Sequence, residues 1–334
     1  MFELSKDWSE LPSLWSALAK RGSTDMDGLP RLEVQPPWDV PDTVVITAAA
    51  SGRILREESA DRTAGFGLDI DSFITASVDS IEAGAVGIHL DILGIPKIAE
   101  SGLTVPEAYS KIYAGISERT GRDWICDANV LNGDTFEQNM FAITGGLAET
   151  VPMAPNFPVQ WMESAAHVAS EHGVRLVFSI HSAAEVDLAN RLVLSKGILK
   201  EKPAWGILIG YPYDDSTTRL ATYLCSPKVM MTELIAICDR IHEIDPDPYI
   251  LVAAAGRSSQ YMVATAMLLG LHVRVGTEDT AFRFPHSNEL LNDSAESVRR
   301  AVDTAAVVGR RVATANEARA LVGLPIRTRE VVSS

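Results

Sequence analysis

The sequence contains little cysteine: its 334 residues include three, Cys126, Cys225 and Cys238. They form no CxxC pair and lack the spacing of a disulfide framework, which argues against a small disulfide-stabilised secreted domain. The opening segment MFELSKDWSELPSLW carries acidic residues and no unbroken apolar run, which argues against a signal peptide or a membrane anchor. We therefore expect a cytoplasmic protein with reduced thiols and no membrane partner.

Positive charge is also scarce, because 29 Lys and Arg face 44 Asp and Glu, for a net charge of −15. The basic residues are scattered along the chain and form no stripe, which argues against nucleic acid as a partner. A local pocket with one or two arginines can still bind an anionic small substrate. Hydrophobic residues make up 46% of the chain, so a large core can form without disulfides.

Several catalytic motifs are missing from the chain. It has no GxSxG nucleophile elbow, Walker loop, HExxH helix or EF-hand loop, which argues against the hydrolase and kinase classes that such motifs define. The segment AAASGRI, at the end of the first apolar run, also lacks the GxGxxG turn of a dinucleotide-binding sheet. An open Rossmann sheet is therefore disfavoured.

From residue 43 onward, short β-branched runs alternate with longer segments of helical periodicity, which is typical of βαβ units on a parallel sheet. Strands are expected at 44–49, 85–92, 123–130, 148–153, 174–180, 205–211, 249–255 and 272–276. Helices are expected near 70–83, 105–119, 135–142, 157–172, 183–197, 217–240, 257–269 and 294–309. Helix ends are indicated by Gly84, Gly173, Gly197 and Gly270. Eight strands alternating with eight helices favour a closed (β/α)8 TIM barrel, a fold that commonly uses about 250 residues.

The composition before the first strand differs from the rest of the chain. We predict that residues 1–42 form an N-terminal arm and that residues 43–334 form the TIM-barrel catalytic domain. The arm is rich in Pro, Asp, Trp and Ser and has one short amphipathic stretch. The apolar residues of that stretch, which we expect to cover a neighbouring element or a partner subunit, are Leu11, Leu14, Trp15 and Leu18.

The active site of such a barrel lies at the carboxyl ends of the strands, where the loops converge. His89 and Asp91 stand two residues apart at the end of the second strand, so their side chains point to the same side. Arg274, Glu278 and Asp279 occupy the end of the eighth strand, which neighbours the first in a closed barrel. An imidazole and two carboxylates at one mouth form a candidate three-ligand site for a catalytic divalent metal.

Each of these residues also has a simpler explanation when it is taken alone. A single histidine is more often a hydrogen-bonded core residue, and carboxylates at strand ends often cap helices. The combination of His89, Asp91 and Glu278 at one predicted mouth favours a site. Further polar residues at strand ends, which we expect to line the mouth, are Asp127, Asn129, Ser179 and His181.

Four segments of the chain resemble a known enzyme family. They are AAAGRSSQYMVATAMLLGLHVRVGTEDTAF, VVITAAASG, IEAGAVGIHLDI and GRRVATANEARALVGL. They resemble the β-keto acid cleavage enzymes, the family typified by 3-keto-5-aminohexanoate cleavage enzyme. The resemblance implies a barrel that binds zinc through an HxH pair on the second strand and the glutamate of a GxED motif. It also implies a homo-oligomer that converts a β-keto acid and acetyl-CoA into acetoacetate and a new CoA thioester.

The resemblance assigns roles to individual residues. His89 matches the first histidine ligand and Glu278 the glutamate ligand, while Arg274 and Asp279 match the arginine and aspartate assigned to catalysis. Asp279 would be the base and Arg274 its orienting partner. The residues that we expect to contact the substrate are Arg257, in the GR turn after the seventh strand, Asn129 and Thr47.

The chain departs from the family pattern at the second histidine, where it has Asp91. A His-Asp-Glu set is harder and more anionic than His-His-Glu, so Mn, Mg or Fe compete with Zn. Leu93 and Gly94 replace the arginine and the acid that usually follow. The metal ligands are therefore predicted to be His89, Asp91 and Glu278, with zinc implied by the resemblance.

Other departures concern the substrate. Val130 and Ala154 align near the serine and the threonine that bind the substrate carboxylate in the family. Ile54 stands where the aminohexanoate enzymes have a glutamate for the substrate amino group, so an amino-bearing keto acid is disfavoured. The keto acid is expected to be less polar.

Three functions remain open at this point. The first is β-keto acid cleavage with an altered metal site. The second is a metal-dependent lyase, aldolase or hydrolase that has lost CoA chemistry, and the third is a non-catalytic binding or assembly subunit. The joint presence of Arg274, Glu278 and Asp279 favours the first.

Overall fold

The computed structural model describes residues 39–52, 66–121, 123–211 and 226–327, together with residues 13, 16 and 37. Within this part, eight parallel strands close into a barrel in which the last strand pairs with the first. In chain order they are β2 (Ile46–Ala48), β3 (Gly87–Leu90), β4 (Ile125–Ala128), β5 (Thr150–Met153), β6 (Arg175–Ile180), β7 (Ala204–Ile209), β8 (Ile250–Ala254) and β9 (His272–Val275). The predicted TIM barrel is confirmed.

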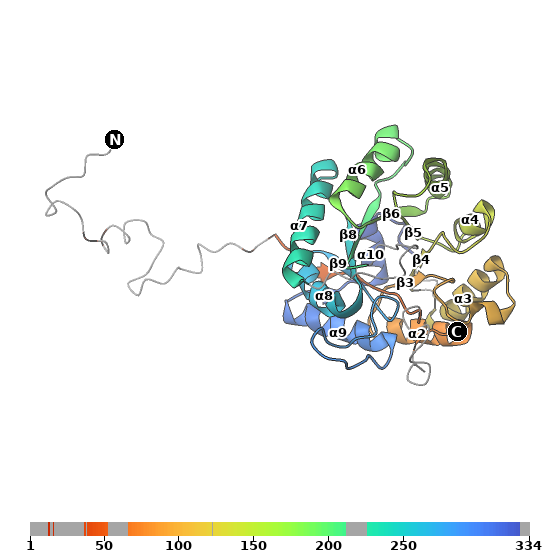
Figure 1. Ribbon diagram of the computed structural model, residues 1–334, viewed down its shortest axis with the longest axis horizontal. Coiled ribbons are helices and arrows are strands. Elements are labelled where there is room, and N and C mark those ends of the chain that lie inside the picture. Colours follow the sequence, from red (N-terminus) through yellow and green to blue (C-terminus); the bar gives the residue numbers. More distant parts are fainter. Residues whose placement is uncertain are drawn as a thin grey trace. The chain divides into compact units, whose positions relative to one another are not determined.

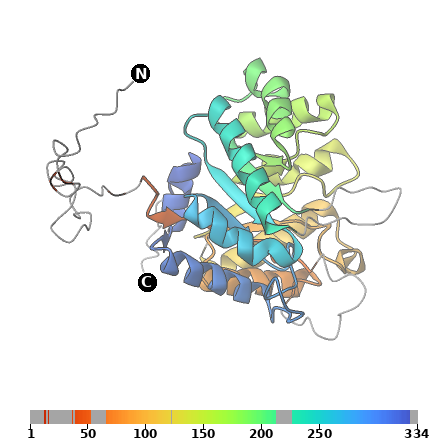
Figure 2. The ribbon, with the colours of Figure 1, turned by 60° about the vertical axis from the view of Figure 1, so that its left-hand side comes forward.

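Helices surround the barrel in chain order and form a ring around the strands (Figure 1). They are α2 (Ile70–Glu82), α3 (Val105–Thr120), α4 (Phe136–Thr144), α5 (Val159–Glu171), α6 (Ala183–Leu192), α7 (Pro227–Ile244), α8 (Ser259–Leu268) and α9 (Ser294–Val307). Figure 2 shows α8 and α9, in light and dark blue, running along the outside of the strands. No helix of the described residues is long and apolar enough to cross a membrane.

The alternation of side chains along the strands separates a helix-facing surface from a barrel interior. Outward residues such as Ile46, Ile88 and Phe178 are fully buried in the main core against the helices. Inward residues at the amino end of the strands, such as Val45 and Ile125, belong to a second, smaller apolar cluster. An apolar layer therefore fills part of the amino end of the interior.

The first predicted strand, 44–49, is divided into two in the structure. β1 (Thr43–Val44) pairs with β10 (Arg311–Val312), and the barrel strand β2 starts after it. Between them, the backbone N–H of Val45 donates a hydrogen bond to Nδ1 of His272, 3.1 Å away. A side chain thus takes the place of a strand partner and interrupts the run.

The start of one helix differs from the prediction, and some of the residues singled out above lie outside the described part of the chain. Helix α7 begins at Pro227, inside the predicted range 217–240, because Ser226 caps its first turn and proline is tolerated at that position. The four apolar residues of the arm, together with Ile54 and Cys225, lie outside the described residues. The boundary and the role of the arm stay predictions.

The C-terminal helix α10 (Ala315–Val322) packs against the amino end of the barrel. Its Ala318 and Val322 share the smaller apolar cluster with the inward residues of the strands. The side chain of Arg319 is fully buried and donates to Glu149 Oε1 at 2.8 Å and to the carbonyl oxygen of Trp124 at 2.8 Å. The end opposite the mouth is thus closed by an apolar layer that holds a buried ion pair.

We expect Arg319→Met to destabilise the protein by about 3 kcal/mol, because it leaves the Glu149 carboxylate without its buried partner. Arg327, 3.0 Å from Glu149, moderates this loss. Urea unfolding measures the change. The matched control is Arg311→Met, which removes the exposed ion pair with Glu317 on the same C-terminal segment and should change stability much less. Equal losses in both variants would contradict the prediction.

Candidate active site

Three inward side chains on neighbouring strands meet in the barrel interior. His89 of β3 lies in register with Asp127 of β4, which lies in register with Thr150 of β5. His89 Nδ1 is 2.7 Å from Asp127 Oδ2, and Thr150 Oγ1 donates to Asp127 Oδ1 at 2.6 Å. The parallel register itself therefore aligns the carboxylate that orients the histidine ring.

The His89 side chain is buried and faces a second carboxylate on its other side. Nε2 of His89 lies 3.7 Å from Oε1 of Glu278. Burial lowers the pKa of His89, but the charges of Glu278 and Asp127 outweigh it and raise the pKa above its ordinary value. Burial also raises the pKa of Asp127, but the hydrogen bond from His89 and its charge outweigh it, so this pKa is lowered. Asp127 is therefore ionised and holds His89 Nδ1–H.

A tight turn after β9 brings Glu278 and Asp279 over the mouth. Gly276 has a φ of 148°, and a Cβ at this position would lie 2.1 Å from the carbonyl oxygen of Ala49. Only glycine permits this approach between the end of β9 and the end of β2. The backbone N–H of Glu278 then donates to the carbonyl oxygen of Ala49 at 3.1 Å. The GTED sequence thus places two carboxylates beside the first barrel strand.

Arg274 and Asp279 form a buried ion pair at this end of the barrel. The guanidinium donates through Nε to Asp279 Oδ2 at 3.2 Å and through Nη2 to Asp279 Oδ1 at 2.5 Å. Nη2 also lies 3.4 Å from Glu278 Oε1. Burial lowers the pKa of Arg274, but the interactions with Asp279, Tyr211 and Glu278 together outweigh it and raise the pKa, so the guanidinium stays charged. The pairing of Arg274 with an acid inside the barrel satisfies the requirement of a buried guanidinium.

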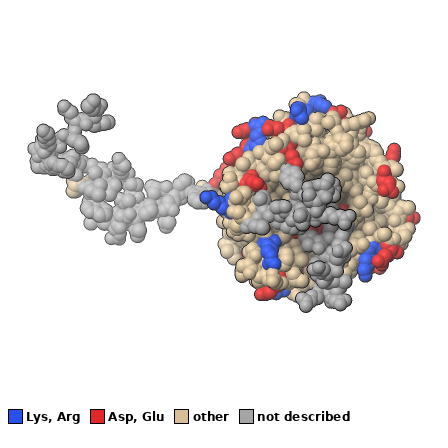
Figure 3. All heavy atoms as spheres, in the orientation of Figure 1, with Lys and Arg blue, Asp and Glu red and all other residues tan. Residues whose placement is uncertain are grey.

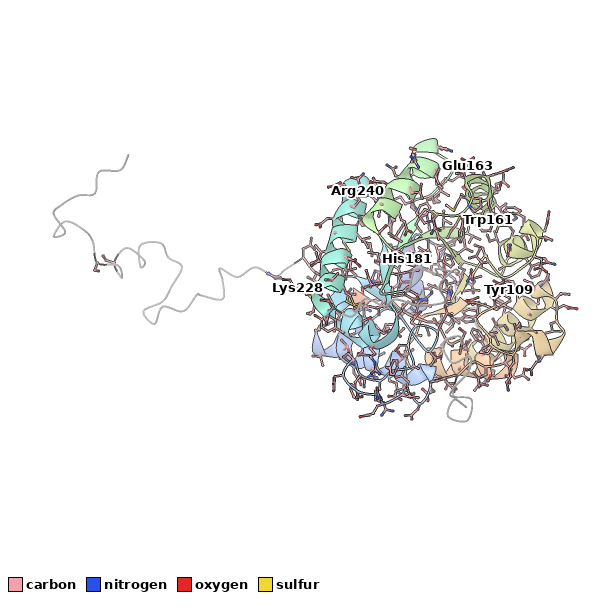
Figure 4. All side chains as sticks on the ribbon, in the orientation of Figure 1. Tyr109, Trp161, Glu163, His181, Lys228 and Arg240 are labelled. Atoms are coloured by element: carbon pink, nitrogen blue, oxygen red, sulfur yellow. The ribbon has the colours of Figure 1, made fainter. Side chains whose placement is uncertain are left out.

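Tyr211 joins this pair and was not singled out from the sequence. Its hydroxyl oxygen lies 3.0 Å from Arg274 Nη2, and its hydroxyl group donates to Asp279 Oδ1. His181, at the end of β6, lies edge-on to the Tyr211 ring with 6.2 Å between ring centroids, and Figure 4 places it near the barrel axis. The signal that could have indicated Tyr211 was an aromatic residue at the carboxyl end of the strand predicted at 205–211.

The Asp91 carboxylate lies on the Glu278 side of the mouth. A Cβ on residue 94 would lie 2.9 Å from Asp91 Oδ2 and 2.9 Å from Ser51 Oγ. Ser51 Oγ in turn donates to Glu278 Oε2 at 3.0 Å. Two departures from the family pattern are thus coupled, because the space that a side chain at Gly94 would need is taken by Asp91 and Ser51.

Two of the three predicted metal ligands, His89 and Glu278, are placed so that a divalent cation could lie between them. With its Nδ1–H bound to Asp127, His89 directs an Nε2 lone pair at the Glu278 carboxylate. Two such acceptors repel each other unless a proton or a cation lies between them. A carboxylate behind a metal-binding imidazole is also the common arrangement around protein metals. In the described part of the chain, however, no group of three or more His, Cys, Asp and Glu is placed to hold one ion.

The three predicted substrate-binding residues lie in different surroundings. Thr47 is buried in the barrel interior, in register with Arg274. Asn129 Oδ1 accepts from the backbone N–H of Leu131 at 3.0 Å, within its own loop. The guanidinium of Arg257 lies 3.9 Å from the ring centroid of Phe282 and donates to Asn288 Oδ1, so it contacts the loop after β9.

Charges on the surface are mixed in sign. On the face shown in Figure 3, many of the lysine and arginine side chains lie at the rim near acidic ones. Examples among the described residues are the pairs Arg240 with Asp187 and Lys196 with Glu163. The buried arginine of the mouth is therefore a local feature.

A sequence model of the β-keto acid cleavage enzyme family matches residues 43–324 of the chain. Over 73 residues the chain is 40% identical to the 3-keto-5-aminohexanoate cleavage enzyme of Fusobacterium nucleatum, a match that covers 22% of this chain and 26% of that protein. The match thus spans about a quarter of the length of this curated relative. A solved type I 3-dehydroquinate dehydratase from Clostridium difficile superposes with a TM-score of 0.52 at 11% identity, over 80% of this chain and 94% of that chain. This last likeness shows the fold alone.

Proposed function

The chain belongs to the β-keto acid cleavage enzyme family, and we propose that it exchanges an acyl group between a β-keto acid and acetyl-CoA. The products are acetoacetate and a new CoA thioester. The observation that carries this proposal is the buried Arg274–Asp279 pair beside His89 and Glu278 at one mouth of the barrel. A base held by a fixed cation next to a metal-binding pair suits removal of a proton beside a carbonyl group.

Each residue of the candidate site has a separate role in the proposed reaction. His89 and Glu278, with Asp91, would hold a divalent cation, zinc or a harder ion, and such a cation would stabilise the negative charge that develops on a keto oxygen. Asp279 takes a proton from C2 of the keto acid. The resulting carbanion attacks the thioester carbonyl of acetyl-CoA, and the carbon–sulfur bond breaks and releases the CoA thiolate. The CoA thiolate then attacks the original keto carbon, which releases acetoacetate as its carbanion, and Asp279 returns the proton to C2. Arg274 binds both oxygens of the Asp279 carboxylate and fixes its plane.

The substrate is proposed to be a keto acid without an amino group. Val130, which follows β4, is fully buried, and Ala154 follows β5. Neither side chain offers the hydroxyl group that binds the substrate carboxylate in the relatives that the sequence resembles. The keto acid therefore relies on other contacts of the mouth and is less polar than an aminohexanoate.

A mass-spectrometric screen tests the proposed reaction. The purified protein is incubated with acetyl-CoA and a panel of β-keto acids that vary in chain length and polarity. Acetoacetate and one new thioester are expected from at least one member. No product from any member would refute the proposal, and cleavage that proceeds equally without CoA would instead support a metal-dependent lyase.

Asp91→Asn tests the third proposed ligand. The amide is a weaker ligand for a divalent cation than the carboxylate, so we expect the metal content of the purified protein to fall. Elemental analysis of the wild type and the variant measures the metal per chain. Asp134→Asn, on the loop after β4, is the matched control and should retain the wild-type content. Unchanged metal content in Asp91→Asn would exclude Asp91 as a major ligand.

A further inference from the structure

The hydrogen bonds of Asp279 distinguish its two carboxylate oxygens. We propose that Tyr211 is a positioning residue that saturates Oδ1 of Asp279, so that Oδ2 is the atom that exchanges the proton with the substrate. This inference rests on the proposed function, because it concerns the base of that same reaction. Tyr211 itself need not touch the substrate.

The direction of each hydrogen bond follows from the groups involved. A guanidinium can only donate, so the Tyr211 oxygen accepts from Arg274 Nη2, 3.0 Å away. The single hydroxyl hydrogen of Tyr211 is then free to donate to Asp279 Oδ1, which is its other partner. Burial raises the pKa of Tyr211 well above its usual range, so the phenol keeps this hydrogen at working pH.

The two carboxylate oxygens of Asp279 differ in how many of their lone pairs accept a hydrogen bond. A carboxylate offers about two acceptor positions on each oxygen. Oδ1 of Asp279 accepts from Tyr211 and from Arg274 Nη2, so both of its positions are used. Oδ2 accepts from Arg274 Nε at 3.2 Å, and no other described residue donates to it, so among these residues one of its positions is free. The Asp279 side chain is completely buried, so it is not exposed to bulk solvent.

The local sequence explains how Tyr211 reaches the pair. Strand β7 ends at Ile209, and Gly210 follows with a φ of 74°. A Cβ on Gly210 would lie 2.7 Å from the Met230 side chain, so both the backbone conformation and the space favour glycine. This left-handed residue turns the chain so that the next side chain enters the mouth, against the ring of His181.

Removal of the Tyr211 hydroxyl group should have different effects on stability, KM and kcat, depending on whether its role is structural, substrate-binding or positioning. Loss of a structural hydroxyl lowers stability without a selective effect on the chemical step. Loss of a substrate contact raises KM. Loss of a positioning contact lowers kcat at nearly constant KM, because Asp279 then populates orientations in which Oδ2 misses the proton.

Tyr211→Phe removes only the hydroxyl group and tests the proposal in the purified holoenzyme. Acetoacetate is the probe, because it is a product of the proposed reaction and its C2 protons are the ones that Asp279 exchanges. Loss of the C2 proton signal in D2O, corrected for the rate without enzyme, is followed by NMR at several acetoacetate concentrations. We expect the maximal exchange rate to fall about tenfold to hundredfold with the half-saturating concentration unchanged.

Tyr249→Phe is the matched control. Tyr249 stacks on His272 at the amino end of the barrel, with 4.5 Å between ring centroids, so it lies away from the mouth. This variant should exchange at the wild-type rate. The melting temperatures of both variants should lie within about 4 °C of the wild type, as expected for the loss of one hydroxyl group.

Each other outcome overturns the proposal. Exchange by Tyr211→Phe at the wild-type rate, or a higher half-saturating concentration with an unchanged maximal rate, refutes the positioning role while the proposed function stands. No exchange by the wild type refutes both. If Tyr211→Phe does not fold, Gly210→Ala serves instead, because the φ of 74° at residue 210 is unfavourable for alanine and the turn that places Tyr211 must then change. Gly210→Ala should show the same loss of exchange, and a wild-type rate in that folded variant refutes the proposal.

Discussion

Replacement of Asp279 by asparagine is expected to lower kcat for thioester formation by about 10²- to 10⁴-fold, the usual contribution of a general base. The amide is nearly the same size as the carboxylate but takes up no proton at neutral pH. KM for acetyl-CoA should change little, because Asp279 acts on the keto acid. Initial rates of thioester formation, measured by mass spectrometry with the keto acid that the screen identifies, give both constants.

The control for this variant must remove another buried, paired carboxylate. Asp245 is suited, because it is buried, lies 2.8 Å from Lys202 Nζ and accepts from Trp205 Nε1 at 3.3 Å. It sits just before β8 begins, at the amino end of the barrel. Asp245→Asn should lose stability and keep kcat. A kcat of Asp279→Asn within threefold of the wild type would show that Asp279 is not the base.

The order of the elements could be predicted because each strand and each helix carries its own local signal. The run predicted at 249–255 is β8 (Ile250–Ala254), and the one at 272–276 is β9 (His272–Val275). Gly173 and Gly270, predicted to end helices, have φ values of 69° and 79°. Periodicity and glycine placement are properties of short segments, so they need no knowledge of distant contacts.

The contacts of the site depend on register and could not be read from such segments. His89 and Asp127 are brought together by the pairing of β3 with β4, across 38 positions of sequence. Tyr211 and Asp279 are 68 positions apart and meet only because β7 and β9 flank β8 in the closed barrel. The strand ends that carry the candidate site could be located, and the resemblance paired Arg274 with Asp279, but neither of these two other contacts had a signal in the sequence.

The departure at Asp91 illustrates the same limit. The family resemblance implied that Asp91 stands in place of a histidine and Gly94 in place of an acid, as two separate changes. The structure relates them, because Asp91 Oδ2 and Ser51 Oγ each lie 2.9 Å from the position of a Cβ on residue 94. Steric coupling of this kind links a strand end to the loop that follows it, and no pattern in the residue types reveals it.

His89→Ala should deplete the purified protein of the proposed divalent cation, because it removes the imidazole that faces Glu278. Loss of a residue that merely orients a metal ligand weakens binding by about tenfold to hundredfold, and loss of the ligand itself should cost at least as much. Elemental analysis measures the metal per chain. Added cation should also raise the melting temperature of the metal-free wild type by mass action, but not that of the variant.

Two further variants test whether the loss of metal depends on the position of His89 in the mouth of the barrel. Asp127→Asn keeps His89 but replaces the carboxylate 2.7 Å from Nδ1, so its affinity should fall between those of the wild type and His89→Ala. His172→Ala removes an exposed histidine at the end of α5 and should leave the metal content unchanged. If His89→Ala keeps the wild-type metal content, the cation lies elsewhere, and the raised pKa of His89 then reflects a proton shared between the imidazole and the Glu278 and Asp127 carboxylates.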